Sequence, residues 1–374
     1  MEKQKIIQVW VPGLSFSGGI QAFSKDFLRA LTQGTGGVRK IVLSKNDLPG
    51  ETPNTPDVVY RSFGHLPEPL RKIAFAFGLV LYAIRYRPSL IVVGHAHFAR
   101  IAALLKRFLG IPFWVIAYGL EVWDERGDEV ANSLRSADRI LSISSFTRDK
   151  LIEQQKLNPK QFVILPTTFD ETRFSPQPKP DALLKKLNLQ PDSRVILTVC
   201  RLAGAERYKG YDLIVHALPA VLKSIPTAHY VLVGKGGDEG RVREMVNELE
   251  LQEHVTLAGF VSEDELADYY NLCDVFAMPS KREGFGIVFL EALACGKPVL
   301  AGNADGSVDA LCHGELGALI NPDDVDEIVR SLVDILQGNY PLPIIYQPEQ
   351  LRQKVIDRYG FTRFAATLMG YLKE

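Results

Sequence analysis

Short apolar runs rich in β-branched residues alternate with longer amphipathic stretches along most of the chain. This alternation is typical of βαβ units and predicts a doubly wound α/β fold with parallel sheets. Because the runs are apolar at nearly every position, we expect central strands buried on both faces. In the first half, strands are expected at residues 6–11, 40–43, 90–93, 113–117, 140–143 and 162–165. In the second half, they are expected at residues 195–199, 230–233, 255–257, 275–278, 298–301 and 318–320.

A proline-rich segment separates the two series of strands. Pro176, Pro178 and Pro180 follow at two-residue intervals, and this spacing can continue neither a helix nor a central strand. We therefore expect two domains, residues 1–170 and residues 181–356. Ligands of doubly wound sheets bind beyond the carboxyl ends of the strands, so binding residues are expected in the loops that follow the strands.

One apolar stretch, residues 73–84, has Arg71, Lys72, Arg85 and Arg87 near its ends. It is too short to span a bilayer, which takes about 20 apolar residues. A buried helix with solvated ends is the expected interpretation. The alternative is an interfacial helix that lies on anionic lipid.

Composition narrows the class of protein. The 374 residues include 43 basic and 44 acidic ones, with 46% hydrophobic and 23% charged residues, which is typical of a soluble globular protein. The near-neutral total argues against a nucleic-acid binder. Residues 1–166 nevertheless hold 22 basic and 14 acidic residues, so the first half would suit an anionic acceptor or a membrane surface. The alternative is accidental surface composition. With no signal-peptide pattern, we expect a cytoplasmic protein, at most attached to a membrane face.

The strongest chemical signal is SKREGFGIVFLEALACGKPVLA, residues 280–301. Its glycines allow a tight turn, and a helix is expected from about Gly286 to Cys295 with its N-terminus available to an anion. Glu283, in the loop before this helix, can accept hydrogen bonds from ligand hydroxyls. Glu291 lies within the otherwise apolar helix, where a carboxylate needs a partner such as the vicinal diol of a ribose. The alternative is that both are ordinary surface glutamates.

Two further loops follow strands. In TVCRLAGAERYKGYDLIVHAL, Arg201 follows a buried strand and Lys209 precedes a helix, so the two cations suit a diphosphate. In VWVPGLSFSGGIQAF, Gly18 and Gly19 open a helix after the first strand, where the backbone can approach a phosphate. Solvated surface cations and a plain tight turn are the corresponding alternatives.

Together these residues resemble those of the retaining glycosyltransferases of family 4, which have the GT-B fold. The resemblance rests on Gly18-Gly19, on Arg201 with Lys209, and on Glu283 with Glu291. The segments YVLVGKGG, VTLAGFVSEDEL and FVILPTTFDETRFSP add to it, so that it covers most of the chain. It implies two Rossmann-like domains that face each other across a cleft. It also implies transfer of a hexose from a nucleotide sugar by front-face attack, without a metal, with UDP as the favoured nucleotide and UDP-glucose as the first donor to test.

The resemblance implies a donor site in the second domain. Glu291 and Gly234 would lie at the ribose of the nucleotide, and Arg201 and Lys209 at its diphosphate. Glu283 and the backbone of Phe285, Gly286 and Ile287 would contact the donor sugar. Phe260 and Val261 would lie beside the base. The final helix, about residues 357–374, would return to the first domain. The acceptor would be a saccharide or a lipid-diphosphate-linked saccharide, in the synthesis of an envelope polysaccharide, an exopolysaccharide or a glycolipid.

The chain departs from the family pattern in the first domain. Where the family has a His-Gly pair near the donor sugar, this sequence has Tyr118 before Gly119. His95 and His97 follow the preceding strand and are the candidates for a catalytic contact with the sugar or the acceptor, with a structural role as the alternative. Pro166-Thr167-Thr168 stands where the family has Pro-Asn-Gly.

Two other functions fit the same residues. A nucleotide-sugar epimerase or a phosphorylase could use the same architecture, and turnover of the donor without an acceptor would favour it. An NAD-dependent dehydrogenase or an NAD-binding module is the second alternative. Its sequence support is Gly234-x-Gly236-x-x-x-Gly240, but the spacing differs from the dinucleotide pattern and the matching acidic residue is missing.

Overall fold

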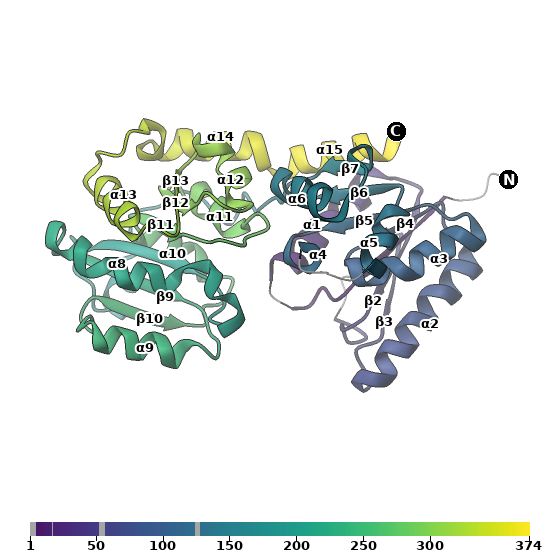
Figure 1. Cartoon of the computed structure of the whole chain (residues 1–374), viewed down its shortest axis with the longest axis horizontal. Coiled ribbons are helices and arrows are strands. Elements are labelled where there is room, and N and C mark those ends of the chain that lie inside the picture. The colour runs from purple at the N-terminus through teal and green to yellow at the C-terminus, as the bar shows by residue number, and fades with distance from the viewer. Residues whose placement is uncertain (1–4, 17, 52–56, 124–127) are drawn as a thin grey trace. The chain divides into compact units, whose positions relative to one another are not determined.

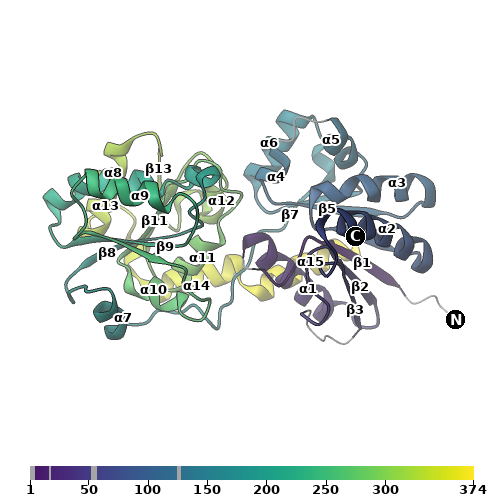
Figure 2. The same ribbon diagram turned by 90° about the horizontal axis from the view of Figure 1, so that it is seen from below.

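The computed structural model describes residues 5–16, 18–51, 57–123 and 128–374. The chain divides into two compact units: unit 1 comprises Met1–Thr168 and Phe361–Glu374, and unit 2 comprises Phe169–Gly360. Each unit is built on one parallel sheet with helices on both of its faces (Figures 1 and 2). The predicted pair of doubly wound α/β folds is therefore confirmed.

Unit 1 has a seven-stranded sheet. Its strands are β1 (Ile6–Val11), β2 (Arg39–Ser44), β3 (Val58–Ser62), β4 (Leu90–Val93), β5 (Phe113–Ala117), β6 (Arg139–Ser142) and β7 (Phe162–Ile164). Its helices are α1 (Gly19–Gly34), α2 (Glu68–Tyr86), α3 (Ala99–Leu109), α4 (Leu120–Trp123), α5 (Asp128–Arg135), α6 (Ser145–Gln155) and, from the end of the chain, α15 (Phe361–Lys373). Helix α15 packs on α1, and Phe364 lies edge-on against Phe23 with the ring centres 5.5 Å apart.

Unit 2 has a six-stranded sheet. Its strands are β8 (Arg194–Val199), β9 (Ala228–Val233), β10 (Val255–Gly259), β11 (Val275–Met278), β12 (Val299–Gly302) and β13 (Ala318–Ile320). Its helices are α7 (Asp181–Lys186), α8 (Tyr211–Ser224), α9 (Glu239–Glu248), α10 (Leu266–Leu272), α11 (Ile287–Ala294), α12 (Ser307–Ala310), α13 (Val325–Gln337) and α14 (Pro348–Tyr359).

Each sheet reverses its strand order at one point. The order is β3-β2-β1-β4-β5-β6-β7 in unit 1 and β10-β9-β8-β11-β12-β13 in unit 2. The reversals therefore lie between β1 and β4 and between β8 and β11. At such a point the loops after the two strands diverge to opposite faces and leave room for a ligand. Most of the predicted binding residues lie in or next to the loops that follow these four strands, whereas Gly234 follows β9, and Phe260 and Val261 follow β10.

Two expectations about unit 1 are corrected. No strand was expected at β3, a half-buried edge strand whose apolar run Val58–Tyr60 is interrupted by the exposed Arg61. The interpretation of the stretch at residues 73–84 as a buried helix is wrong: Phe75 and Leu79 of α2 lie in the core, but Ile73 and Phe77 are 68% and 66% exposed. The helix is apolar on most sides, yet only one of its faces meets the rest of the unit.

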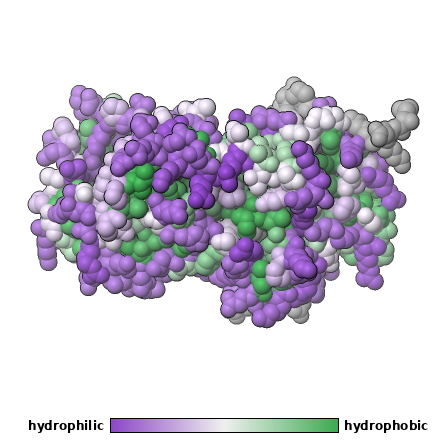
Figure 3. Space-filling model, turned by 90° about the horizontal axis from the view of Figure 1, so that it is seen from above, coloured by the Kyte–Doolittle hydropathy of each residue, from purple (hydrophilic) through white to green (hydrophobic). Residues whose placement is uncertain are grey.

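On the face that Figure 3 shows, hydrophilic residues predominate and apolar ones form smaller groups among them. No helix in the described part of the chain has the length and hydropathy needed to cross a membrane.

Candidate functional site

The candidate donor site lies at the reversal point of the unit 2 sheet. Strands β8 and β11 pair there, with Val275 opposite Ile196 and Phe276 opposite Leu197. The loop after β8 contains Arg201 and ends in a short 3-10 helix (Gly204–Lys209) that carries Lys209. The loop after β11 contains Glu283 and leads into α11. Residues that are 74 positions apart in the sequence are thus brought into contact.

Lys209 and Glu283 form an ion pair, with Lys209 Nζ 2.9 Å from Glu283 Oε2. Glu206 completes a charge cluster: its carboxylate lies 2.5 Å from Arg201 Nη2 and 4.0 Å from Lys209 Nζ. Burial, the largest single influence, disfavours the charge of Lys209, but the attraction and hydrogen bond of Glu283 together with the nearby Tyr208 and Cys200 outweigh it and raise the pKa of Lys209. Two cations and two carboxylates therefore balance each other, and the Arg201 side chain, 77% exposed, is open to an incoming anion.

Glu206 did not emerge from the sequence patterns. The signal that would have found it is an acidic residue between two predicted diphosphate-binding cations. A diphosphate that contacts Arg201 and Lys209 would face this carboxylate and compete with it for the same cations.

Glu291 has the partner that its apolar helix demands. It accepts a hydrogen bond from Tyr270 Oη, 2.6 Å from Glu291 Oε2, and the Tyr270 side chain from α10 is fully buried. Burial raises the pKa of Glu291 to about 7, against the hydrogen bond from Tyr270, which lowers it. Burial disfavours the charged form of this carboxylate, and a ligand that donates further hydrogen bonds to it would stabilise that form.

The N-terminus of α11 is shaped as predicted. Gly286 precedes the first helical residue with φ of 88°, and a Cβ at this position would lie 2.4 Å from the ring of Phe289. Phe285 is buried, and its ring packs edge-on against Tyr359. Ile287 begins the helix, whose first backbone N–H groups have no partner within the helix and suit an anion or a sugar hydroxyl.

A buried carboxylate that the sequence patterns did not single out holds this loop in place. Asp305 Oδ2 accepts hydrogen bonds from the backbone N–H of Glu283 and from Ser280 Oγ, both at 2.7 Å, while Asp305 Oδ1 accepts one from the backbone N–H of Ser307. Burial raises the pKa of Asp305 to about 6. Its only sequence signal is an acidic residue shortly after a strand, at the same sheet edge as the other candidate residues.

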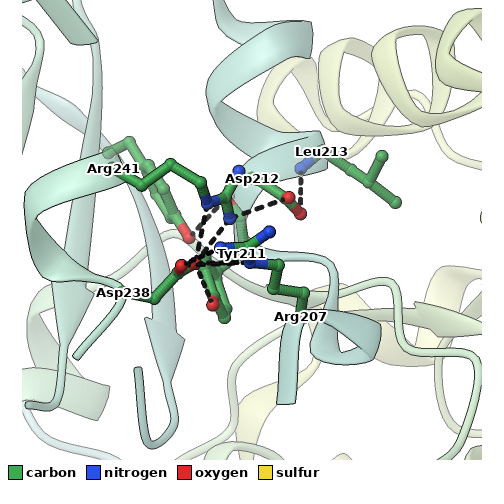
Figure 4. A network of polar contacts seen from close by, with 7 residues as sticks. Arg207, Tyr211, Asp212, Leu213, Asp238 and Arg241 are labelled. Carbon is green, nitrogen blue, oxygen red and sulfur yellow. Dashed lines mark hydrogen bonds and ion pairs between the residues drawn. The ribbon is translucent and has the colours of Figure 1, made fainter. Parts of the chain in front are cut away.

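The segment that carries Lys209 is anchored by a second network (Figure 4). Asp238 is almost fully buried and accepts hydrogen bonds from Arg207 Nη2 at 2.6 Å, Tyr211 Oη at 2.7 Å and Arg241 Nη2 at 2.6 Å. Arg241 also reaches Asp212 at 3.1 Å. Arg207 belongs to the 3-10 helix that carries Lys209, and Tyr211 begins α8. Asp238 directly precedes α9, so its hydrogen bonds join the 3-10 helix to the starts of α8 and α9.

We expect Asp238→Asn to lower the free energy of unfolding by about 2 kcal/mol at neutral pH, because charge-assisted hydrogen bonds from two arginines are lost. Burial alone would raise the pKa of Asp238, but the hydrogen bonds from Arg241, Arg207 and Tyr211 lower it below its usual range. This stability is present above the unfolded-state pKa of about 3.8 and is lost as the pH falls through the native-state pKa. Urea denaturation at pH 7 and pH 3 measures both effects, with the exposed Asp264→Asn as the matched control. An Asp238→Asn protein as stable as the control at pH 7 would contradict the anchoring role.

The remaining unit 2 residues lie beside these loops. Gly234 has φ of 140°, and a Cβ there would lie 1.7 Å from the carbonyl oxygen of Cys200, so its glycine is required for packing the β8 and β9 loops together. Phe260, after β10, is 63% exposed, and Val261 is partly buried. The exposed ring of Phe260 is available for stacking on a planar ligand.

In unit 1, the candidate residues also lie in loops at the reversal point. Gly18 precedes the first residue of α1, Gly19, and its carbonyl accepts a hydrogen bond from the Ala22 N–H at 2.9 Å. The buried Asp47 orders the loop after β1: its carboxylate accepts hydrogen bonds from the backbone N–H groups of Leu14 and Ser15 at 2.8 and 2.9 Å.

The histidines follow β4. His95 precedes a 3-10 helix (Ala96–Phe98), with its ring centre 4.7 Å from that of the exposed His97. Tyr118, which stands at the position of the family histidine, is buried with its ring edge-on against Phe23 at 5.4 Å. Glu121 accepts a hydrogen bond from the Tyr118 backbone N–H at 2.6 Å. Tyr118 therefore belongs to the core of unit 1, whereas His97 is accessible to a ligand.

Metal ligands were not expected. Asp324 and Asp326 occupy the start of α13, where the Asp324 side chain accepts a hydrogen bond from the Glu327 N–H at 2.9 Å. Within the part of the chain that the structure describes, no three His, Cys, Asp or Glu side chains gather as metal ligands.

Two family models match the chain. "Glycosyltransferase Family 4" matches residues 17–173, and "Glycosyl transferases group 1" matches residues 181–356. The two matches thus fall on either side of the proline-rich segment.

Curated relatives carry glycosyltransferase names. The GDP-mannose-dependent alpha-(1-6)-phosphatidylinositol monomannoside mannosyltransferase of Mycobacterium tuberculosis is 33% identical over 207 residues, which cover 53% of this chain and 52% of that protein. The chain therefore spans about half the length of this curated relative. The D-inositol 3-phosphate glycosyltransferase of Thermobispora bispora is 25% identical over 361 residues, covering 87% of this chain and 83% of the relative.

Solved structures share the fold over nearly the whole chain. Sucrose-phosphate synthase from Thermosynechococcus elongatus superposes with a TM-score of 0.81 at 22% identity, covering 99% of this chain and 98% of the other. HepE from Anabaena in complex with UDP also has a TM-score of 0.81, at 19% identity, with 99% of both chains covered. The resemblance inferred from the sequence motifs is confirmed at the level of family and fold.

Proposed function

Because the chain belongs to the glycosyltransferases of the GT-B type, with one family model matching each half, we propose that it is a retaining glycosyltransferase. It transfers a hexose, glucose as the first choice, from a UDP-sugar to a saccharide or lipid-linked saccharide acceptor. The reaction would serve the synthesis of an envelope polysaccharide, an exopolysaccharide or a glycolipid.

The observation that carries this proposal is the pairing of Lys209 with Glu283 beside Arg201 at the reversal point of the unit 2 sheet. It joins two cations suited to a diphosphate with a carboxylate suited to sugar hydroxyls. Glu291 on α11, with its raised pKa, supplies an acceptor for ribose hydroxyls. The Phe260 ring and Val261 would lie beside the base.

The chemistry follows from these charges. Cleavage of the bond between the anomeric carbon and the diphosphate builds negative charge on the leaving group. Arg201, Lys209 and the N-terminus of α11 would stabilise this charge without a metal, as a preorganised electrostatic environment. The acceptor hydroxyl would attack the same face that the diphosphate leaves, with a phosphate oxygen taking its proton, and the anomeric configuration would be retained. His97, with His95 beside it, is our candidate for a contact with the sugar or the acceptor.

A second donor deserves equal testing. The HepE structures with UDP and UDP-glucose support a uridine nucleotide, but they share only about one residue in five with this chain. The M. tuberculosis relative, whose name specifies GDP-mannose, is 33% identical over half the chain. GDP-mannose is therefore the alternative donor.

Calorimetric titration with UDP, GDP, ADP and NADH, each without added metal, tests the proposal. We expect UDP to bind in the micromolar range, about −8 kcal/mol, and to bind at least tenfold more tightly than the other three. The UDP-sugars are then compared in the same way, followed by turnover with and without a saccharide acceptor.

The other possible results would each favour a different donor or function. Preference for GDP would favour GDP-mannose as the donor. Donor turnover that needs no acceptor would favour an epimerase or a phosphorylase, and tight NADH binding without nucleoside diphosphate binding would overturn the proposal in favour of an NAD-binding protein.

A further inference from the structure

Helix α2 carries an exposed apolar stripe. Five large hydrophobic side chains on this helix are between 48% and 68% exposed: Leu70, Ile73, Phe77, Leu81 and Ile84. Their spacings of three and four residues place them on one face of an α-helix. The opposite side of the helix, with Phe75, Leu79 and Ala83, is buried in the core of unit 1.

The neighbouring helix extends the exposed apolar surface. Helix α3 packs beside α2, as Figures 1 and 2 show. On α3, Leu104 is 48% and Phe108 73% exposed, and the two are four residues apart on one face. Single exposed apolar residues are ordinary, but seven on two adjacent helices mark a surface that is covered in function. We call the seven residues the α2–α3 apolar surface.

Basic residues outnumber acidic ones around this surface. Glu68, at the start of α2, pairs with Arg71 and Lys72. On α3, Arg100 pairs with Glu129 and Lys106 with Asp138. Between Pro69 and Gly110 the chain contains seven arginines and lysines and neither aspartate nor glutamate. Among them, Lys72, Arg85 and Arg87 on or next to α2 and Arg107 on α3 are exposed. The long stems of such side chains can lie along an apolar surface while their charged ends reach polar head groups.

We propose that the α2–α3 apolar surface binds the surface of an anionic lipid bilayer. The apolar side chains enter the boundary between head groups and acyl chains, and the arginines and lysines contact lipid phosphates. A second copy of the chain fits less well, because its own α2–α3 surface would bring the exposed Arg85, Arg87 and Arg107 against the same three arginines, and basic residues are in excess around this surface. This inference rests on unit 1 alone and does not depend on the proposed transferase activity.

Sedimentation with sucrose-loaded vesicles tests the proposal. The full-length protein is mixed with vesicles of phosphatidylcholine alone or with added phosphatidylglycerol. We expect binding to the phosphatidylglycerol vesicles, weaker binding as salt is raised, and little binding to phosphatidylcholine. Ile73→Gln/Phe77→Gln and Arg85→Gln/Arg107→Gln should each lower the partition coefficient at least about tenfold, since two apolar side chains or about 1 kcal/mol for each cation are removed.

Matched controls separate a lipid surface from a general loss of structure. Leu48→Gln replaces another exposed apolar residue of unit 1, and Lys160→Gln/Lys185→Gln removes two exposed lysines outside the α2–α3 surface. Both should bind vesicles like the wild type, and all four variants should keep the wild-type circular dichroism and thermal midpoint, because the exchanged side chains are exposed.

Three results would overturn the proposal. These are equal binding to neutral and anionic vesicles, wild-type binding by the Ile73→Gln/Phe77→Gln protein, and no binding to either kind of vesicle. The surface instead joins two copies of the chain if the wild type binds no vesicles and analytical ultracentrifugation shows that it is a dimer. In that case the Ile73→Gln/Phe77→Gln protein should be a monomer.

Discussion

Replacing Arg201 and Lys209 together by alanine is expected to weaken UDP binding about 1,000-fold, or about 4 kcal/mol, because charge-assisted hydrogen bonds contribute about 1.5–3 kcal/mol each. The double variant should lose contacts with the diphosphate of UDP and keep those with its nucleoside. The preference for UDP over UMP, measured by calorimetry, should therefore shrink sharply in the double variant.

Two comparison variants make this test specific. Glu206→Gln removes a carboxylate that contacts Arg201 and faces Lys209, so it should tighten UDP binding where the alanine variant weakens it. Arg243→Ala removes an exposed arginine on α9 that pairs with Glu239 and should leave the UDP affinity unchanged. If the double variant binds UDP as the wild type does, the diphosphate assignment is wrong.

Replacing Glu291 by glutamine is expected to weaken UDP binding about 100-fold, or about 2.7 kcal/mol, because hydrogen bonds from ribose hydroxyls to a charged, partly buried carboxylate are lost. Burial raises the pKa of Glu291 to about 7, and donated hydrogen bonds favour its charged form. The wild-type advantage over the variant should therefore grow as the pH rises from 6 to 8. Calorimetry of both proteins across this range measures the difference and cancels the titration of UDP itself.

Whereas the wild-type advantage in UDP binding should grow with pH, the stability of the wild type relative to Glu291→Gln should fall as the pH rises. The folded protein holds the Glu291 proton more tightly than the unfolded chain, whose glutamate pKa is about 4.5. The wild type should therefore lose about 2–3 kcal/mol of unfolding free energy relative to Glu291→Gln as the pH rises from 5 to 8. Urea denaturation at the two pH values measures this loss, with the exposed Glu248→Gln as control. A Glu291→Gln protein that keeps wild-type UDP affinity at pH 8 would refute the ribose contact, whatever its stability.

The local elements of the donor site were accessible from the sequence because they depend on neighbours along the chain. Helix α11 was expected from about Gly286 to Cys295 and runs over Ile287–Ala294, since glycines bound it and its apolar residues have high burial. The place of Arg201 after β8 and of Lys209 before α8 follows from the same alternation of strands and helices.

The partners of these residues were not accessible in this way. The sequence indicates that Glu291 needs a partner, but Tyr270 lies on α10, and only the packing of α10 against α11 identifies it. Glu206 and Asp305 carry no pattern of their own, because a single acidic residue in a loop is common. Their roles depend on which loops the sheet brings together.

The α2 segment shows the limit of periodicity most clearly. A helix that is apolar on most sides satisfies a buried and an exposed position equally well, so the pattern at residues 73–84 does not state which face meets the sheet. The burial of Phe75 and the exposure of Phe77 are decided by where the core of unit 1 ends.

The sequence by itself determined the two doubly wound sheets, their strand positions with the exception of β3, and the family to which the chain belongs. Periodicity and turn chemistry are local properties, and the family motifs are short. Only the tertiary structure decided that β8 lies beside β11, and hence that Lys209 meets Glu283 across 74 residues of sequence. The physical reason is that strand order is set by the packing of helices on both faces of the sheet, a non-local property that no short stretch of residues encodes.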